Sequence, residues 1–174
     1  MRLKAGDVAK DFSLEDISGK QLSLADFKDK KLLLSFYRYA SCPLCNLRVS
    51  QLIQIYDELK SKGLCFIAFF QSPKESIEKY VGIQNAPFPI ISDPERKIYK
   101  LYGVEHSWIG YLRGGISITM LRALWKGFMI GKMEGKKNLL PADFLIDNIK
   151  VKKAYYGKTI SDNLPIDEIK EFLI

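Results

Sequence analysis

Two short, nearly continuous apolar runs with one helical stretch between them constrain the fold more than any other feature. The runs are KKLLLSFY at residues 30–37 and GLCFIAFF at residues 63–70. Such runs are typical of strands that are covered on both faces of a sheet. Residues 43–62 between them carry apolar side chains at the spacing of one helix face: Leu44, Leu47, Leu52, Ile55, Tyr56 and Leu59.

The rest of the chain continues the alternation of helices and strands. Beyond residue 70 the pattern indicates, in order, a short helix at 74–81, a strand at 87–93, a helix at 94–103, two strands at 142–148 and 150–157, and a closing helix at 165–173. Alternating elements followed by a strand pair predict an α/β fold, with a central β-sheet and helices on both of its faces.

Two cysteines lie where the first run ends and the helical stretch begins, in the sequence CPLC. Pro43 suits the first position of a helix, which makes Cys42 the N-cap residue. A sulfur at this position faces unpaired backbone N–H groups and the positive end of the helix dipole, which favour the thiolate. Cys45 lies one turn further on the same side, so the pair can close a disulfide with little backbone movement. The pattern predicts a redox pair in which Cys42 attacks and Cys45 resolves.

Composition and charge indicate the compartment of the protein and the classes of partner it can bind. The chain has 174 residues, no apolar run that could span a bilayer and an N-terminus that turns polar at once, so we expect a cytoplasmic protein with no transmembrane segment. In a reducing compartment a close cysteine pair is more often catalytic or metal-binding than a structural disulfide. The net charge of +7 comes from 27 basic residues spread among 20 acidic ones, without a nucleic-acid-binding signature. We therefore expect no nucleic-acid partner.

Zinc binding, hydrolysis and nucleotide binding have weaker support in the sequence than redox chemistry. Zinc needs about four ligands, and beyond the pair only Cys65 and His106 are candidates. Cys65 lies inside an apolar run, where we expect it to be buried and protonated. A hydrolase needs a base beside its nucleophile, and motifs for phosphate loops and dinucleotides are absent, so we expect no metal and no cofactor. A binding module that has lost its chemistry stays open as an alternative.

Residues 114–138 fit this order least well. Their apolar side chains recur at helical spacing, between Gly114-Gly115 on one side and Gly131 on the other: Ile118, Leu121, Leu124, Trp125 and Phe128. We expect an inserted amphipathic helix that packs on the domain. A cover over a partner groove, a homodimer contact and a membrane-surface helix are the alternatives.

Several stretches carry a family resemblance: GDVAKDFSLEDISGKQLSLADFKDKKLLLSFY, FYRYASCPLCNLRV, PFPIISDPERKIYKLYGV and LPADFLIDNIKVKKAYYGKTISD. Together they resemble the peroxiredoxin-like branch of the alkyl hydroperoxide reductase/thiol-specific antioxidant family. The resemblance implies one thioredoxin-like domain over residues 1–174, with a central mixed β-sheet flanked by helices, an N-terminal β-hairpin extension and an insert at 104–138. It also implies a thiol reductant as partner, either a thioredoxin-like protein or a low-molecular-weight thiol.

The cysteine site departs from the pattern of that family, which is Pro-x-x-x-Thr-x-x-Cys plus a distant arginine. Arg38 takes the place of the proline, Cys42 that of the threonine and Cys45 that of the peroxidatic cysteine, while the distant arginine falls at Pro141. The resemblance to thioredoxin-like proteins implies that Pro141 is a cis-proline beside the pair, where it would shape the substrate groove. Arg38 is expected to support the site by lowering a thiol pKa through its charge.

We therefore predict a thiol-dependent antioxidant oxidoreductase that cycles Cys42 and Cys45 between dithiol and disulfide, with Pro43, Arg38 and Pro141 in support. Thiol–disulfide exchange is the expected reaction, because groups that donate to the O–O bond in the family are replaced here. The alternative is a hydroperoxide reductase in which Cys45 is the peroxidatic cysteine.

Overall fold

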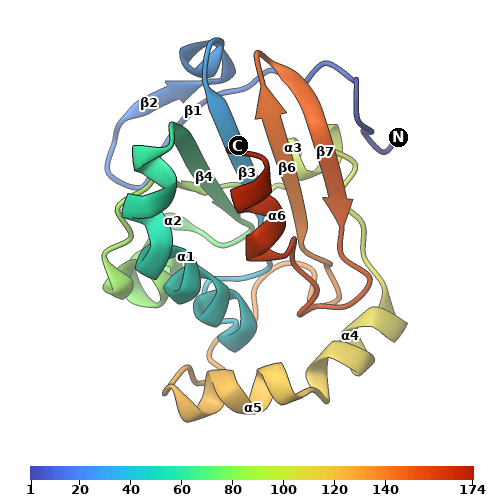
Figure 1. Ribbon diagram of the computed structural model, residues 1–174. Helices are drawn as coiled ribbons and strands as arrows, with labels where there is room; N and C mark the ends of the chain where they lie inside the picture. The colour runs from blue at the N-terminus through green and yellow to red at the C-terminus, as the bar shows by residue number, and fades with distance from the viewer.

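A five-stranded mixed β-sheet forms the centre of the protein (Figure 1). The computed structural model describes all residues, 1–174. The strands are β1 (Ser13–Glu15), β2 (Gln21–Ser23), β3 (Lys31–Phe36), β4 (Leu64–Phe70), β5 (Ile90–Ser92), β6 (Ala142–Asp147) and β7 (Lys150–Tyr156). The α-helices are α1 (Pro43–Ser61), α2 (Lys74–Lys79), α3 (Lys97–Leu101), α4 (Trp108–Gly115), α5 (Ile118–Trp125) and α6 (Ile166–Glu171), and the 3-10 helices are η1 (Leu24–Phe27) and η2 (Val81–Gln84).

The strand order of the sheet is β5-β4-β3-β6-β7, with β3, β4 and β5 parallel to one another. Strand β6 runs antiparallel to β3, and β7 runs antiparallel to β6. Strand β3 therefore lies at the centre, where Leu33 pairs with Phe66 on one side and with Leu145 on the other. The two apolar runs of the sequence are its central strands, as predicted.

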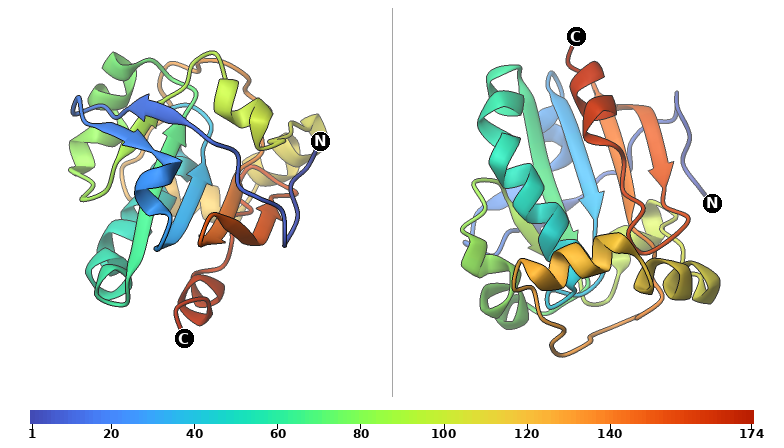
Figure 2. Two further views of the ribbon diagram at one scale, coloured as in Figure 1. Left: turned by 90° about the horizontal axis from the view of Figure 1, so that it is seen from above. Right: turned by 60° about the horizontal axis from the view of Figure 1, so that its bottom comes forward.

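Each face of the sheet is covered by its own set of elements: helices α1 and α6 on one face, and the N-terminal segment with helix α3 on the other. On one face, Leu52 of α1 and Ile169 of α6 pack with Leu33 in one buried cluster, and Figure 2 shows both helices in front of the sheet. On the other face, Phe12 beside the β1–β2 hairpin and Tyr99 of α3 pack in a second cluster. The thioredoxin-like α/β architecture with an N-terminal hairpin is confirmed.

Tyr99 joins this packing to the end of the central strands. Its side chain is 1% exposed, and its hydroxyl donates to the carbonyl oxygens of Tyr37 (2.7 Å) and Phe69 (2.8 Å). The carbonyl of Tyr37 belongs to the residue directly before Arg38, at the end where the chain leaves β3 for α1. Tyr99 therefore fixes the position from which the loop to Cys42 begins.

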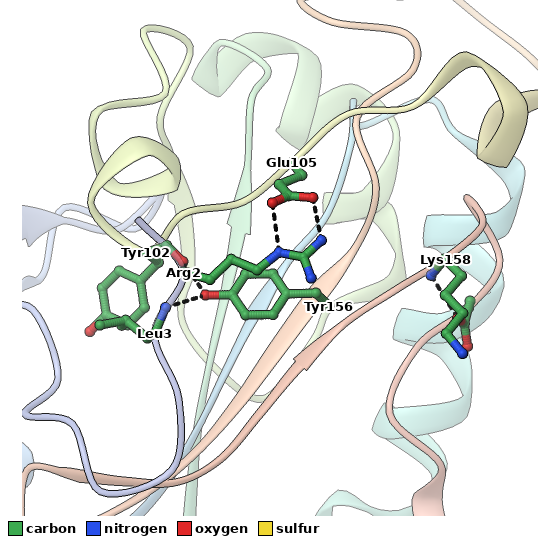
Figure 3. A network of polar contacts seen from close by, with 7 residues as sticks. Arg2, Leu3, Tyr102, Glu105, Tyr156 and Lys158 are labelled. Carbon is green, nitrogen blue, oxygen red and sulfur yellow. Dashed lines mark hydrogen bonds and ion pairs between the residues drawn. The ribbon is translucent and has the colours of Figure 1, made fainter.

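The insert leaves and re-enters the domain at one place. The backbone N–H of Leu140 donates to the carbonyl of Glu105 (3.0 Å), so the two ends lie side by side. The guanidinium of Arg2 binds the carboxylate of Glu105, with 2.6 Å from Nε to Oε1, and lies over the ring of Tyr156 (Figure 3). Tyr156 in turn donates to the carbonyl of Tyr102 (2.7 Å), just before the insert.

The insert contains two short helices instead of the single helix expected from its periodicity. Ser117 separates them, because its side chain caps α5 by accepting from the N–H of Met120 (3.2 Å). Helix α5 packs on the domain, but through Ala123 and Met120 and not through the apolar stripe, since Ile118, Leu121 and Trp125 are exposed. None of the helices is both long and apolar enough to cross a bilayer.

We expect Tyr99→Phe to lower the free energy of unfolding by about 1–3 kcal/mol, because a buried hydroxyl with two carbonyl partners is lost. Urea unfolding followed by circular dichroism measures this. Tyr56→Phe is the matched control, since the hydroxyl of Tyr56 has no protein partner. Equal stability of the two variants would show that the bonds of Tyr99 contribute nothing.

Candidate active site

The cysteine pair lies at the N-terminus of α1, directly beyond the carboxyl end of β3. Cys42 is the N-cap residue and Pro43 is the first residue of the helix, as the sequence predicted. The Cys42 sulfur accepts from the backbone N–H of Cys45 at 3.4 Å. Both cysteines are free thiols, Cys42 with no exposed surface and Cys45 with 5%. The helix thus supplies a backbone donor to one sulfur only.

A buried arginine supplies a second donor to the same sulfur. Arg38 is 1% exposed, and its Nη2 lies 2.8 Å from Cys42 Sγ. Its Nη1 donates to the carbonyl of Lys137 at 2.8 Å, and no carboxylate binds it. The guanidinium carbon lies 5.0 Å from the ring centre of Tyr39 and 5.6 Å from that of Tyr111, both within the range of cation–π attraction.

These contacts separate the pKa values of the two thiols. Burial acts to raise the pKa of Cys42, but its interactions with the Cys45 thiol, the Arg38 charge and the Cys45 N–H outweigh burial and lower that pKa to about 6. Burial and the neighbouring Cys42 raise the pKa of Cys45 well above its usual value. Burial also disfavours a charged guanidinium, yet the Cys42 thiolate raises the pKa of Arg38. At neutral pH the stable arrangement is a thiolate at Cys42, a thiol at Cys45 and a charged Arg38.

An apolar cavity of about 230 Å³ reaches the site from the insert. On the site side it is lined by Arg38, Tyr39 and Pro43, and on the insert side by residues that include Tyr111 and Ile116. The Nε of Arg38 is buried and has no partner in the protein. One N–H of the cation beside Cys42 is therefore unpaired within the protein.

The segment 132–137 of the insert crosses the site as a strap. The hydroxyl of Ser41 donates to the carbonyl of Lys132 (2.6 Å). Gln71 makes two bonds to the backbone of Lys136, from its Nε2 to the carbonyl (2.8 Å) and from the N–H to its Oε1 (2.9 Å). Together with the bond from Arg38 to Lys137, these contacts exclude solvent from the Cys42 sulfur.

Comparison with known proteins places this site in a family. Residues 5–154 match the AhpC/TSA family. The chain belongs to the AhpC/TSA family. Peroxiredoxin Bcp of Escherichia coli (strain K12) is 33% identical over 116 residues, which is 66% of this chain and 74% of that protein. Thiol-dependent redox catalysis, predicted from the cysteine pair, is thereby confirmed as the general activity of this AhpC/TSA protein.

Solved structures agree on the fold. Peroxidoxin BcpB from Mycobacterium tuberculosis superposes with a TM-score of 0.72 at 19% identity, covering 99% of this chain and 97% of that one. The thioredoxin domain of a thiol-disulfide oxidoreductase from Bacteroides vulgatus superposes with a TM-score of 0.60 at 19% identity, covering 99% of both chains. A protein named a peroxidoxin and one named a thiol-disulfide oxidoreductase therefore both share this architecture.

Pro141 differs from its expected form in this AhpC/TSA protein, because the structure contains no cis peptide bond. The backbone around Pro141 is extended and paired on both sides. Leu140 donates to the carbonyl of Glu105 (3.0 Å), and the carbonyl of Pro141 accepts from Gly157 (2.9 Å), which continues the ladder of β6. The bond before Pro141 thus has the ordinary trans form, and the backbone bound to Arg38 is that of Lys137 instead.

The burial of one further residue differs from expectation. Cys65 is half-buried instead of fully buried, because it packs at the margin of the second cluster near the start of β4. Arg48 does not approach the sulfurs by any hydrogen bond, and its Nη2 donates to the carbonyl of Leu164 (2.5 Å). No three His, Cys, Asp or Glu side chains gather as a metal site would require.

Sequence reasoning missed the partners that hold Arg38 in place. Lys137 lies 99 residues away in the chain and contributes only its carbonyl, which carries no sequence signal. Tyr111 lies on α4, before the stretch whose periodicity drew attention to the insert. The one available signal was an arginine four residues before a cysteine of the pair.

We expect Arg38→Met to raise the pKa of Cys42 by about one to three units, because the nearby positive charge and one donor are lost while burial remains. Titration of thiolate ultraviolet absorbance in the reduced protein measures this, and the wild-type step should fall at about pH 6. Arg113→Met removes an exposed positive charge on α4 and should leave the titration unchanged. An unshifted step in Arg38→Met would contradict the assignment of the cation.

Proposed function

We propose that this AhpC/TSA protein reduces small hydroperoxides, with Cys42 as the attacking thiolate and Cys45 as the resolving thiol. The observation that carries the proposal is the bond from Arg38 to the sulfur of Cys42. A cation and a backbone N–H favour the charged form of one sulfur, whereas the other remains a buried thiol with a raised pKa. The reduced site thus holds a nucleophile, the Cys42 thiolate, next to a protonated thiol at Cys45.

The reaction proceeds in two steps. The Cys42 thiolate attacks one oxygen of the hydroperoxide, an S–O bond forms as the O–O bond breaks, and the alkoxide or hydroxide that leaves takes a proton from solvent to become an alcohol or water. The product is a sulfenic acid at Cys42. The sulfur of Cys45 then attacks that of Cys42, an S–S bond forms, and the sulfenic oxygen leaves as water with the proton of Cys45. The peroxide gains two electrons and the cysteine pair loses two.

Four observations support a small hydroperoxide as oxidant. The free Nε–H of Arg38 offers a donor to the departing oxygen, which replaces the donor that the sequence comparison had counted as missing at Pro141. The cavity of about 230 Å³ admits a small molecule. A protein disulfide would first have to displace the strap at 132–137, with its bonds to Ser41 and Gln71. The Escherichia coli relative is itself named a peroxiredoxin.

A thiol reductant completes the cycle. Two thiol groups, from a thioredoxin-like protein or from two low-molecular-weight thiols, return the Cys42–Cys45 disulfide to the dithiol by exchange and become a disulfide themselves. The cytoplasm maintains such thiols in reduced form. We therefore place the working protein in that compartment.

Thiol–disulfide exchange is the second candidate, and it was the reaction that the sequence favoured. The C-x-x-C spacing at the start of α1 supports it, because the same Cys42 thiolate can attack a disulfide and Cys45 can release the mixed intermediate. The two candidates share both cysteines and differ in the oxidant alone. A peroxidatic Cys45 is disfavoured, because burial and the adjacent Cys42 keep it protonated.

In the Cys45→Ser protein, hydrogen peroxide should produce a stable sulfenic acid at Cys42, because no thiol remains to resolve it. In Cys42→Ser, peroxide should leave Cys45 unmodified over the same time. Trapping with a sulfenic-acid reagent and mass spectrometry of the peptides locates the adduct. Cys65→Ser serves as the control and should behave like the wild type.

An adduct at Cys45 in Cys42→Ser would reverse the assignment of the two cysteines. To identify the oxidant, stopped-flow measurements on the reduced wild type compare its rate of oxidation by hydrogen peroxide with that by oxidised glutathione at equal concentration. Faster oxidation by the peroxide is expected. Faster oxidation by the disulfide would make thiol–disulfide exchange the function.

A further inference from the structure

The outer side of α4 and α5 presents a large exposed apolar surface. Eleven of the sixteen exposed large hydrophobic side chains of the chain lie between Trp108 and Met133. We call the part on the two helices the insert face; its members are Trp108, Leu112, Ile116, Ile118, Leu121 and Trp125. Figures 1 and 2 show both helices along one end of the molecule. Exposed apolar patches of this extent mark interaction surfaces.

The insert face is held outward by close packing of small residues on the inner side. A Cβ at Gly110 would lie 2.5 Å from the carbonyl oxygen of Lys158, and one at Gly114 would lie 2.5 Å from Ile160 Cγ1. On α5 the buried residue is Ala123, with no exposed surface. Rotating either helix to bury its large apolar side chains would drive them into this contact. The insert face therefore needs a partner from outside the domain.

The charges around the insert face all have one sign. Between His106 and Met133 the chain carries Arg113, Arg122, Lys126 and Lys132 and no acidic side chain, and only Lys132 has an acidic partner, Glu134 at 3.4 Å. All four are exposed. Such a surface attracts a partner that has negative charges on its surface and an apolar layer directly below them.

We propose that the insert face docks on the surface of an anionic phospholipid bilayer. Short helices with large apolar side chains on one side and basic residues beside them lie in the plane of the membrane interface. Tryptophan favours this interface, and both tryptophans of the chain, Trp108 and Trp125, belong to the insert face. An apolar groove of about 490 Å³, lined by Ile116, Ile118 and Leu121 among others, offers space for the end of a lipid chain.

The same charges disfavour a second copy of the chain as the partner. Two insert faces brought together would place the three unpaired basic side chains of one copy, Arg113, Arg122 and Lys126, against the same three of the other. Neither copy has an acidic residue in this segment to compensate them. Lipid phosphates supply the opposite charge, at about 1 kcal/mol for each basic residue near the surface, which corresponds to roughly fivefold in affinity.

Docking would orient the active site toward the membrane. Leu112 and Ile116 belong to the insert face and also line the cavity that reaches Arg38. The mouth of that cavity would then open at the lipid surface. The docking itself does not depend on the reaction proposed for the cysteines, and it is tested without any activity measurement.

The experiment is co-sedimentation of the full reduced protein with vesicles of phosphatidylcholine plus phosphatidylglycerol, compared with vesicles of phosphatidylcholine alone. We expect binding to the anionic vesicles only, with a blue shift of tryptophan fluorescence as Trp108 and Trp125 leave water. Leu121→Gln/Trp125→Gln should weaken binding by at least about tenfold. Arg122→Gln/Lys126→Gln should weaken it by roughly fivefold per charge, and added salt should do the same.

Matched controls lie outside the insert. Leu101→Gln changes an exposed apolar residue on α3, and Lys28→Gln removes an exposed charge, so both should bind as the wild type does. Circular dichroism checks that each variant is folded. No binding to the anionic vesicles, or equal binding by wild type and the insert variants, would overturn the proposal. Self-association in sedimentation velocity that Leu121→Gln/Trp125→Gln abolishes, without vesicle binding, would assign the face to a second copy instead.

Discussion

The contact between the Arg38 guanidinium and the Cys42 sulfur is the interaction on which the site depends. An arginine that is 1% exposed and has no carboxylate partner would be costly to bury without a negative charge beside it. The Cys42 thiolate supplies that charge, and the cation in turn lowers the pKa of the thiol. Each group makes the ionised form of the other stable, so the reduced site is also the electrostatically balanced one.

The same arginine links the redox pair to the insert. Arg38 holds the carbonyl of Lys137 with one nitrogen and lies between the rings of Tyr39 and Tyr111. When Cys42 becomes part of a disulfide, its negative charge disappears while Arg38 stays positive. The contacts of Arg38 with the strap and with α4 then have to accommodate an unbalanced buried charge. One side chain therefore contacts both the redox pair and the insert.

Local patterns in the sequence predicted most of the framework. The runs at 30–37 and 63–70, with one helix face between them, were enough to place β3, α1 and β4 and to make Cys42 the N-cap residue. These features depend on neighbours in the chain, on apolar spacing and on the proline at position 43. The cysteine pair predicted the general activity, and family resemblance added the N-terminal hairpin.

The features that the sequence did not predict depend on contacts between distant segments. The partner of Arg38 is a backbone carbonyl 99 residues away. The backbone on either side of Pro141 pairs with Glu105 and Gly157, which lie far from each other in the chain. The outward direction of the insert face follows from the fit of Gly110 and Gly114 against the segment at 158–161. A helical stripe in the sequence is the same whether it faces the core or the solvent.

The central claim is that Cys42, and not Cys45, is the thiolate of the reduced protein. Carbon-13 NMR of protein labelled at the cysteine Cβ atoms, with assignments from single Cys→Ser variants, follows each thiol separately during a pH titration. We expect the Cys42 resonance to move at about pH 6 while that of Cys45 stays at its thiol position well beyond neutral pH. A titration of Cys45 below that of Cys42 would contradict it.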